Sequence, residues 1–360
     1  MKNKIFLLIF PLLLSGCYDK TEMEERAFII NIGIDSFDQN SVYLNESLGG
    51  ERFALSLDSA PLSHSGADKI ADEETGVFCG TTFAEAIKAY DDLRSKSVFL
   101  GYAKAIVIAE NVLKDPDLLS EAMDYIKSDG KINQKVILLA AKGKAYDIIK
   151  SIDDTESIYD LYISNFYRAK SAGNTSKTDL KTFLESISFA GNAVIPVIAS
   201  DEGRVFLSGS AVLGDYKLSG YLSEDEEMGR LLLSGKADSK KINCGLNTLE
   251  VTKSSSRLSF KAEEGELILN ADIKINGKVY GIVDKSDKNQ IEETEKMFEE
   301  IIKDKIINTI EVTKNVLKTD GQNLMKLLYS ENYNIYKSIA DKRTAYENIK
   351  LNVSVSVNIK

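Results

Sequence analysis

The residue with the clearest chemistry is Cys17, which ends the stretch LLLSGC near the start of the chain. Ten uncharged residues, 5–14, precede it, and Ser15 and Gly16 separate them from the cysteine. Such a run is shorter than the roughly 20 residues of a membrane-spanning helix and is typical of a signal peptide. Leucine, two small residues and cysteine in this order form the lipobox of bacterial lipoproteins. The pattern predicts that residues 1–16 are cleaved and that the Cys17 thiol carries a diacylglyceryl group.

A lipid on Cys17 would hold every later residue outside the cytoplasm. Its two acyl chains suffice for stable anchoring, whereas a single chain is marginal. No later stretch approaches about 18 consecutive apolar residues, so we expect the lipid to be the whole anchor. An ordinary secretory peptide with a chance cysteine at its cleavage site is the alternative, and it fits the narrow pattern less well.

Other residues offer little catalytic chemistry. The acidic run Glu224–Glu227 could bind Ca²⁺ or Mg²⁺, but Ser223 precedes it, and acidic residues after a serine cap also stabilise a helix start. His64 is the single histidine, which disfavours histidine-based catalysis and metal sites. Cys79 and Cys244 could form a disulfide or stay as buried thiols. The sequence has no phosphate loop, dinucleotide fingerprint or nucleophile elbow, so we expect no enzyme, no metal and no cofactor besides the lipid.

Composition sets the class of protein and limits its partners. Residues 17–360 form a chain longer than one core usually serves, and 43% of the sequence is apolar, which suggests two or three domains. Removing Lys2 and Lys4 leaves 43 basic against 55 acidic residues, a net charge of −12. So acidic a chain argues against binding to nucleic acid and against broad contact with anionic lipid.

Strands and helices should alternate in the first half of the chain. Asp19 and Glu22 have capping-box spacing before a short helix. Hydrophobic patterns and cap residues predict strands at 28–35, 52–57, 105–109 and 135–141, and helices at 83–96, 116–129, 143–151 and 174–189. This alternation is typical of an α/β unit. Residues 193–200 contain Pro196, which favours a linker or an edge strand.

A glycine-rich segment opens the second half of the chain. Gly209, Gly214 and Gly220 interrupt short strands within residues 205–223, and Ser223 with Glu226 should cap the following helix. Leu218 and Leu222 should pack under that helix. Gly229 lies inside it, and because glycine there costs about 1 kcal/mol relative to alanine, we expect a neighbouring backbone too close for a side chain.

The C-terminal part should combine antiparallel strands with one long helix. Residues 246–283 alternate like strands, and Asn276 with Gly277 predicts a hairpin turn. Apolar residues at helical spacing predict a helix at 290–318, and two shorter helices follow it. Residues 349–359 alternate without a break, which predicts a strand with one wet face, as in antiparallel sheets.

These elements predict a mixed α/β (α+β) fold of two to three mixed-sheet domains with flanking helices. The first domain should span residues 17–200. The second should span residues 204–360, possibly divided into 204–245 and 246–360.

The chain resembles the Ger(x)C family, the lipoprotein subunits of bacterial spore germinant receptors. The family's G-C-W-D-x-x-E stretch and its strand ending in G-I-D are matched, with Tyr18 in place of tryptophan, by Gly16, Cys17, Asp19, Glu22, Gly33, Ile34 and Asp35. The family's central pattern, G-x-A-V-F, K-L-x-G-x-L and E-x-x-G, is matched by Gly209, Ala211, Val212, Lys217, Leu218, Gly220, Leu222, Glu226 and Gly229.

The resemblance implies a non-enzymatic receptor subunit, lipid-anchored on the outer face of the spore inner membrane, with an elongated set of mixed α/β domains. It also implies assembly with two integral membrane partners, the A-type and B-type subunits. The matched residues are then candidates for assembly. The acidic charge separately predicts that nucleic acid is not a partner. A solute-binding lipoprotein of a transporter is the alternative, since it shares the anchor and the architecture.

Overall fold

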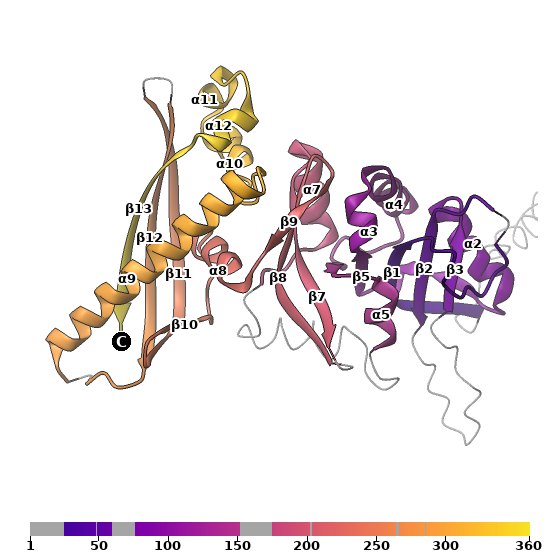
Figure 1. The fold of residues 1–360 in the computed structure, drawn as a ribbon, viewed down its shortest axis with the longest axis horizontal. Coiled ribbons are helices and arrows are strands. Elements are labelled where there is room, and N and C mark those ends of the chain that lie inside the picture. Colours follow the sequence, from indigo (N-terminus) through magenta and orange to yellow (C-terminus); the bar gives the residue numbers. More distant parts are fainter. Residues whose placement is uncertain are drawn as a thin grey trace, which may run out of the picture.

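The computed structural model describes residues 25–47, 49–59, 76–151, 175–201, 204–263, 266–284 and 286–360. These residues form two sheets with flanking helices in an elongated arrangement (Figure 1). The predicted mixed α/β class is confirmed. Cys17, Asp19, Glu22 and His64 lie outside the described residues. Within the described ranges, no helix is both long and apolar enough to cross a bilayer.

The first sheet is mixed, with the strand order β3-β2-β1-β5-β6-β7-β8-β9 and with β4 beside β1. The central neighbours β1, β5, β6 and β7 run parallel, and the outer pairs are antiparallel apart from β4. Every residue of β5 and β6 is buried, because parallel strands with both faces covered are apolar throughout. The strands are β1 (Arg26–Ser36), β2 (Phe53–Ser59), β3 (Gly76–Gly80), β4 (Ser97–Phe99), β5 (Ala105–Ala109), β6 (Ile137–Ala141), β7 (Ala193–Asp201), β8 (Arg204–Gly214) and β9 (Lys217–Leu222).

Two of the helices around the first sheet, α2 and α4, begin at predicted caps. Thr82 accepts a hydrogen bond from Glu85 N at 3.2 Å, and Asp115 accepts one from Leu118 N at 3.1 Å. These caps satisfy backbone donors that a helix start leaves free. The helices are α2 (Phe83–Leu93), α3 (Glu110–Lys114), α4 (Pro116–Asp129), α5 (Ala145–Lys150) and α7 (Leu180–Ala190), with a short 3₁₀ turn at Leu100–Tyr102.

The second sheet has the order β10-β11-β12-β13, and α9 lies across one of its faces (Figure 1). Phe298, Ile302, Ile306 and Ile310 of α9 are buried against the inward residues of the strands. The strands are β10 (Lys241–Cys244), β11 (Asn247–Glu263), β12 (Glu266–Tyr280) and β13 (Lys350–Ile359). The helices are α8 (Glu224–Leu233), α9 (Lys288–Glu311) with a π turn at Val312–Val316, α10 (Leu324–Glu331), α11 (Tyr333–Ser338) and α12 (Lys342–Glu347).

The hairpin predicted at Asn276 and Gly277 is wrong, because β12 continues through both residues and the chain reverses beyond Glu263. The register of β11 shifts opposite them, between Val251 and Lys253. A methyl group on Gly277 would lie 2.5 Å from Leu249 Cδ1. Glycine is therefore present for close packing in a strand beside a bulge, a role that glycine also has within strands.

Two predictions about strand placement are also wrong. β7 lies inside the first sheet, not at its edge, because it pairs with β6 only at Val197 and Ile198, beyond Pro196. β13 pairs parallel to β12 along its whole length, although one of its faces is wet as predicted. The predicted boundary between residues 200 and 204 falls in the β7–β8 connection, so the first sheet extends across it. Cys79 and Cys244 are free thiols, not a disulfide.

Candidate functional site

The central sequence pattern forms the junction between the two sheets, where α8 lies between the β8–β9 hairpin and the second sheet (Figure 1). Gly209 adopts a φ of +65°, and a methyl group there would overlap Leu222 O. A methyl group on Gly220 would lie 2.6 Å from Leu317 Cδ2, just beyond the π turn. Glycine at these positions allows the hairpin to contact α8 and the end of α9 without intervening side chains.

Gly229 brings α8 against α9. A methyl group on it would overlap Lys305 O and Thr309 Oγ1 and would lie 2.8 Å from Lys305 C. The Thr309 hydroxyl is 2.6 Å from Glu226 O and 2.8 Å from Lys305 O, so it can donate to a carbonyl of either helix. The predicted close backbone contact at Gly229 is confirmed.

The acidic run at the start of α8 makes structural contacts. Ser223 and Glu226 form the predicted capping box, with Ser223 N donating to Glu226 Oε2 at 2.7 Å. Asp225 pairs with Lys305 of α9 at 2.6 Å. Within the described ranges, no group of three or more His, Cys, Asp or Glu residues is arranged to hold a metal ion.

Glu227 belongs to a buried ion pair that the sequence reading missed. Its carboxylate is fully buried and accepts two hydrogen bonds from the Arg230 guanidinium, both at 2.7 Å, and one from Ser176 N at 3.1 Å. Arg230 also donates to Ser176 Oγ. Burial lowers the pKa of nearby Lys240, and the charge of Glu227 opposes that shift. The i, i+3 spacing of Glu227 and Arg230 was a signal for the pair, but nothing in the sequence indicated its burial.

Gly33 and Asp35 have a similar packing role in the first sheet. Asp35 is buried and accepts hydrogen bonds from Ala145 N and Tyr146 N, both at 2.9 Å, so it caps α5 from outside the helix. Burial raises the pKa of Asp35 to about 6, although these two hydrogen bonds oppose the shift. A methyl group on Gly33 would lie 2.7 Å from Ile149 Cδ1 of α5. These two residues therefore fix one helix on β1.

Asp320 makes the equivalent contact near the second sheet, and the sequence reading did not identify it. Its carboxylate accepts hydrogen bonds from Leu324 N at 2.9 Å and Met325 N at 2.8 Å, at the start of α10. Burial raises its pKa to about 6. In the same region the Tyr346 hydroxyl donates to Thr313 Oγ1 at 2.7 Å. Asp320 lies in the stretch TDGQN, and an aspartate shortly before a helix is the sequence signal that could have indicated its capping role.

The remaining motif residues are not gathered at one point. Lys217 is exposed at the start of β9, opposite Gly214. Leu218 packs against the core of the first sheet, whereas Leu222 packs with Val312 and Leu317 at the end of α9. The expectation that both leucines lie under α8 is therefore wrong for Leu218.

These features define an elongated, two-sheet α/β protein whose motif residues hold helices and sheets together. Two family models cover nearly all of its described length. The spore germination protein N-terminal domain matches residues 19–200, and the spore germination B3/GerAC-like C-terminal domain matches residues 208–360. The chain belongs to this family of spore germination proteins.

Individual relatives agree with the family match. Spore germination protein A3 of Bacillus subtilis is 20% identical over 78% of this chain and 74% of its own length. Spore germination protein KC of the same organism is 21% identical over 76% of this chain and 73% of its own length. The crystal structure of the GerBC protein superposes with a TM-score of 0.61 at 16% identity, covering 93% of this chain and 99% of that one. This likeness shows the shared fold.

Proposed function

We propose that this chain is a lipid-anchored, non-enzymatic subunit of a spore germinant receptor. The observation that supports it is one sequence with three parts in order: the lipobox ending at Cys17, and then the two spore germination domains at 19–200 and 208–360. Relatives over most of this chain are named spore germination proteins. The diacylglyceryl group on Cys17 would anchor the protein on the outer face of the spore inner membrane.

In this proposal the junction holds the two sheets in a fixed arrangement for assembly with the A-type and B-type integral membrane subunits. The buried pair of Glu227 and Arg230 and the tight contact at Gly229 join both regions. A close-packed junction of this kind resists deformation because it has little room for rearrangement. The motif residues of the N-terminal segment, Asp19 and Glu22, would link the anchor to β1.

Membrane fractionation tests the anchor. The Cys17→Ala variant should leave the membrane fraction or keep its signal peptide, because the acylated thiol is gone. Cys244→Ala is the matched control and should stay membrane-bound, since that thiol lies in β10, far along the chain. Finding Cys17→Ala on the membrane with its signal peptide removed would contradict the lipid anchor.

Affinity purification from detergent-solubilised spore membranes tests the partners. The tagged chain should co-purify with two multi-span membrane proteins, and Gly229→Leu should reduce their recovery. Spores that lack the chain should lose the response to a nutrient while still germinating with a non-nutrient trigger. Co-purification of a permease with an ATPase instead would favour the solute-binding alternative.

A further inference from the structure

The outward face of the second sheet carries positive charge in an otherwise acidic protein. Because side chains alternate along a strand, every second residue of β11, β12 and β13 points away from α9. In the middle of the face, the outward positions at 253–261, 268–278 and 352–358 carry one acidic residue, Asp272, and five cations: Lys253, Arg257, Lys261, Lys274 and Lys278. The ends of the same strands add outward Glu250, Glu263, Glu266 and Lys350, so the three strands together present six cations and four acidic residues. The whole chain has a net charge of −10, whereas the middle of this face, with five cations and one acidic residue, has a net charge of +4.

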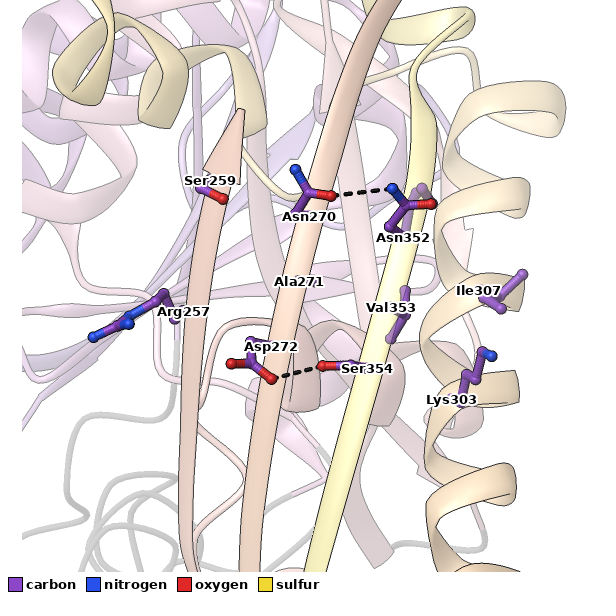
Figure 2. Close-up of a pocket in the computed structure, with 11 residues that line it drawn as sticks. Arg257, Ser259, Asn270, Ala271, Asp272, Lys303, Ile307, Asn352, Val353 and Ser354 are labelled. Carbon is purple, nitrogen blue, oxygen red and sulfur yellow. Dashed lines mark hydrogen bonds between the residues drawn. The ribbon is translucent and has the colours of Figure 1, made fainter. Parts of the chain in front are cut away.

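These five cations are all exposed, and none forms an ion pair with a described residue. Arg257 lies opposite Asp272 in the ladder, yet Figure 2 shows its guanidinium pointing away from that carboxylate. Asp272 instead accepts a hydrogen bond from the Ser354 hydroxyl at 2.6 Å. The positive charge of the face is therefore available to an outside partner.

Between the cations the face is made of amides and hydroxyls. The outward residues of β13 are all asparagine or serine: Asn352, Ser354, Ser356 and Asn358. Figure 2 shows Asn352 paired with Asn270 of β12, at 3.1 Å. A depression of about 720 Å³ lies at these strands. Its outward lining consists of Arg257, Ser259, Asn270, Asp272, Asn352 and Ser354, and Ala271, Leu351 and Val353 with Lys303 and Ile307 of α9 line its other side. Ile268 is the single apolar side chain among the outward positions defined above.

We propose that this face binds an anionic polysaccharide. The carboxylates of the polysaccharide would accept charge-assisted hydrogen bonds from the lysines and Arg257 of the face, and such bonds are stronger than neutral ones. The hydroxyl and amide groups of the polysaccharide would bond to the asparagines and serines between them. Outward side chains recur about every 7 Å along each strand and about 4.8 Å between strands, so one extended chain can contact several of them.

Other anionic partners fit this face less well. A stable protein interface has an apolar centre with aromatic anchors, and these outward positions contain only Ile268. Single-stranded nucleic acid requires several aromatic side chains for base stacking, and the outward positions of these strands offer only Tyr280 at the end of β12, whose hydroxyl is bonded to Glu250. An anionic bilayer would use the cations alone and would leave the amides and hydroxyls without a role.

Direct binding to a defined polymer tests the proposal. The probe is polygalacturonate, a carboxylated polysaccharide, with dextran as its neutral counterpart. The protein is the chain from residue 17 onward with Cys17→Ser, so that no lipid is present. We expect saturable binding of polygalacturonate at low salt, weakened by added salt, and no binding of dextran.

Matched charge reversals distinguish the contribution of this face to binding from the effect of the protein's overall net charge. The triple variant Lys253→Glu, Lys261→Glu and Lys274→Glu should lose at least tenfold in affinity, which corresponds to about 1.4 kcal/mol or more. The control triple Lys88→Glu, Lys135→Glu and Lys337→Glu changes three exposed lysines elsewhere by the same total charge and should lose less than threefold. Equal losses in both triples, or no binding by the parent protein, would overturn the proposal.

A second variant keeps every charge and removes hydrogen-bonding groups. Ser356→Ala with Asn358→Ala should weaken polygalacturonate binding about threefold and leave the binding of poly-glutamate unchanged. Poly-glutamate and phosphatidylglycerol vesicles represent an acidic protein and an anionic membrane. If either binds more tightly than polygalacturonate and depends on the same lysines, the face recognises that partner and the polysaccharide proposal is wrong.

Discussion

The two sheets of this protein differ in how many of their faces are covered. In the first sheet every residue of β5 and β6 is buried. In the second sheet the residues of β12 alternate, with Ile273 buried and its neighbour Lys274 exposed. The difference can be read from sequence, because AIVIA and ILLAA are unbroken apolar runs while residues 266–280 alternate. The first sheet, covered on both faces, gives mechanical support. The second sheet, covered on one face, leaves its other face as a surface for contacts.

Alanine substitutions at adjacent positions give the largest expected effects and test this comparison directly. Ile106→Ala and Val107→Ala in β5 should each lower the free energy of unfolding by about 2–4 kcal/mol, because both side chains are fully buried. In β12, Ile273→Ala should cost about 3 kcal/mol and Lys274→Ala less than about 0.5 kcal/mol. Urea unfolding measures all four values. A neutral Val107→Ala would show that one face of β5 is not covered.

The junction contact at Gly229 comes next in size. Gly229→Ala should cost about 2 kcal/mol, because the added methyl group overlaps Lys305 O and Thr309 Oγ1. Hydrogen exchange should show faster opening in β12 and unchanged protection in β5. Gly245→Ala is the control. A methyl group on Gly245 would meet no neighbouring atom, but the residue has a φ of +56°, so the substitution should cost only about 1 kcal/mol through backbone strain. Equal loss of protection in both sheets would mean that the two regions unfold as one unit.

Two buried aspartates, one in each region, allow the pH dependence of stability to be compared between the regions. Asp35 and Asp320 each have a pKa raised by burial to about 6, above the ordinary value of 3.8. Between pH 4 and 6 the folded protein therefore binds more protons than the unfolded chain. The stability from each group is complete below about pH 4 and is lost as the pH rises through 6, a change of about 1–3 kcal/mol.

Asp35→Asn and Asp320→Asn should each remove part of this pH dependence, measured by urea unfolding at pH 4.5, 5.5 and 7. The absolute stability of each variant also reflects its changed helix cap, so the slope against pH is the informative quantity. A variant whose slope equals that of the parent protein would show that its carboxyl has an ordinary pKa.

The smallest expected effect is at a surface ion pair of the second sheet. Lys350 and Glu266 pair at 2.5 Å, with more than half of each side chain exposed. Lys350→Ala should change the free energy of unfolding by less than about 0.5 kcal/mol, because exposed pairs are screened by water and salt. A loss above 1 kcal/mol in thermal unfolding would mean that this edge of β13 is more firmly held than its exposure suggests.

Local patterns predicted much of the fold. The caps at Thr82, Asp115 and Ser223, the buried strands and the long helix α9 follow from residues close together in sequence. Gly229 was identified because a helix interior has no local use for glycine. Where the prediction failed, the deciding contact came from a distant part of the chain. Asn276 and Gly277 have hairpin chemistry, but pairing with β11 and the packing of Leu249 determine their conformation.

The buried polar groups of the junction were out of reach of sequence patterns. In the sequence Glu227 looked like one of four acids at a helix start, and only the packing of Ser176 and Arg230 around it sets it apart. Asp35 was identified through the family resemblance, but its role in capping α5 depends on residues about 110 positions later.

The parallel pairing of β13 with β12 has a consequence for the order of folding. β11 and β12 are separated by only two residues in the sequence and can pair early, whereas partners such as Asn270 and Asn352 lie 82 positions apart. Contacts of such separation form slowly, because a long loop must close first. Until α9 to α12 have formed and β13 arrives, the edge of β12 is unpaired and open to association with other chains. We expect closure of this sheet to be a late step in the folding of the protein.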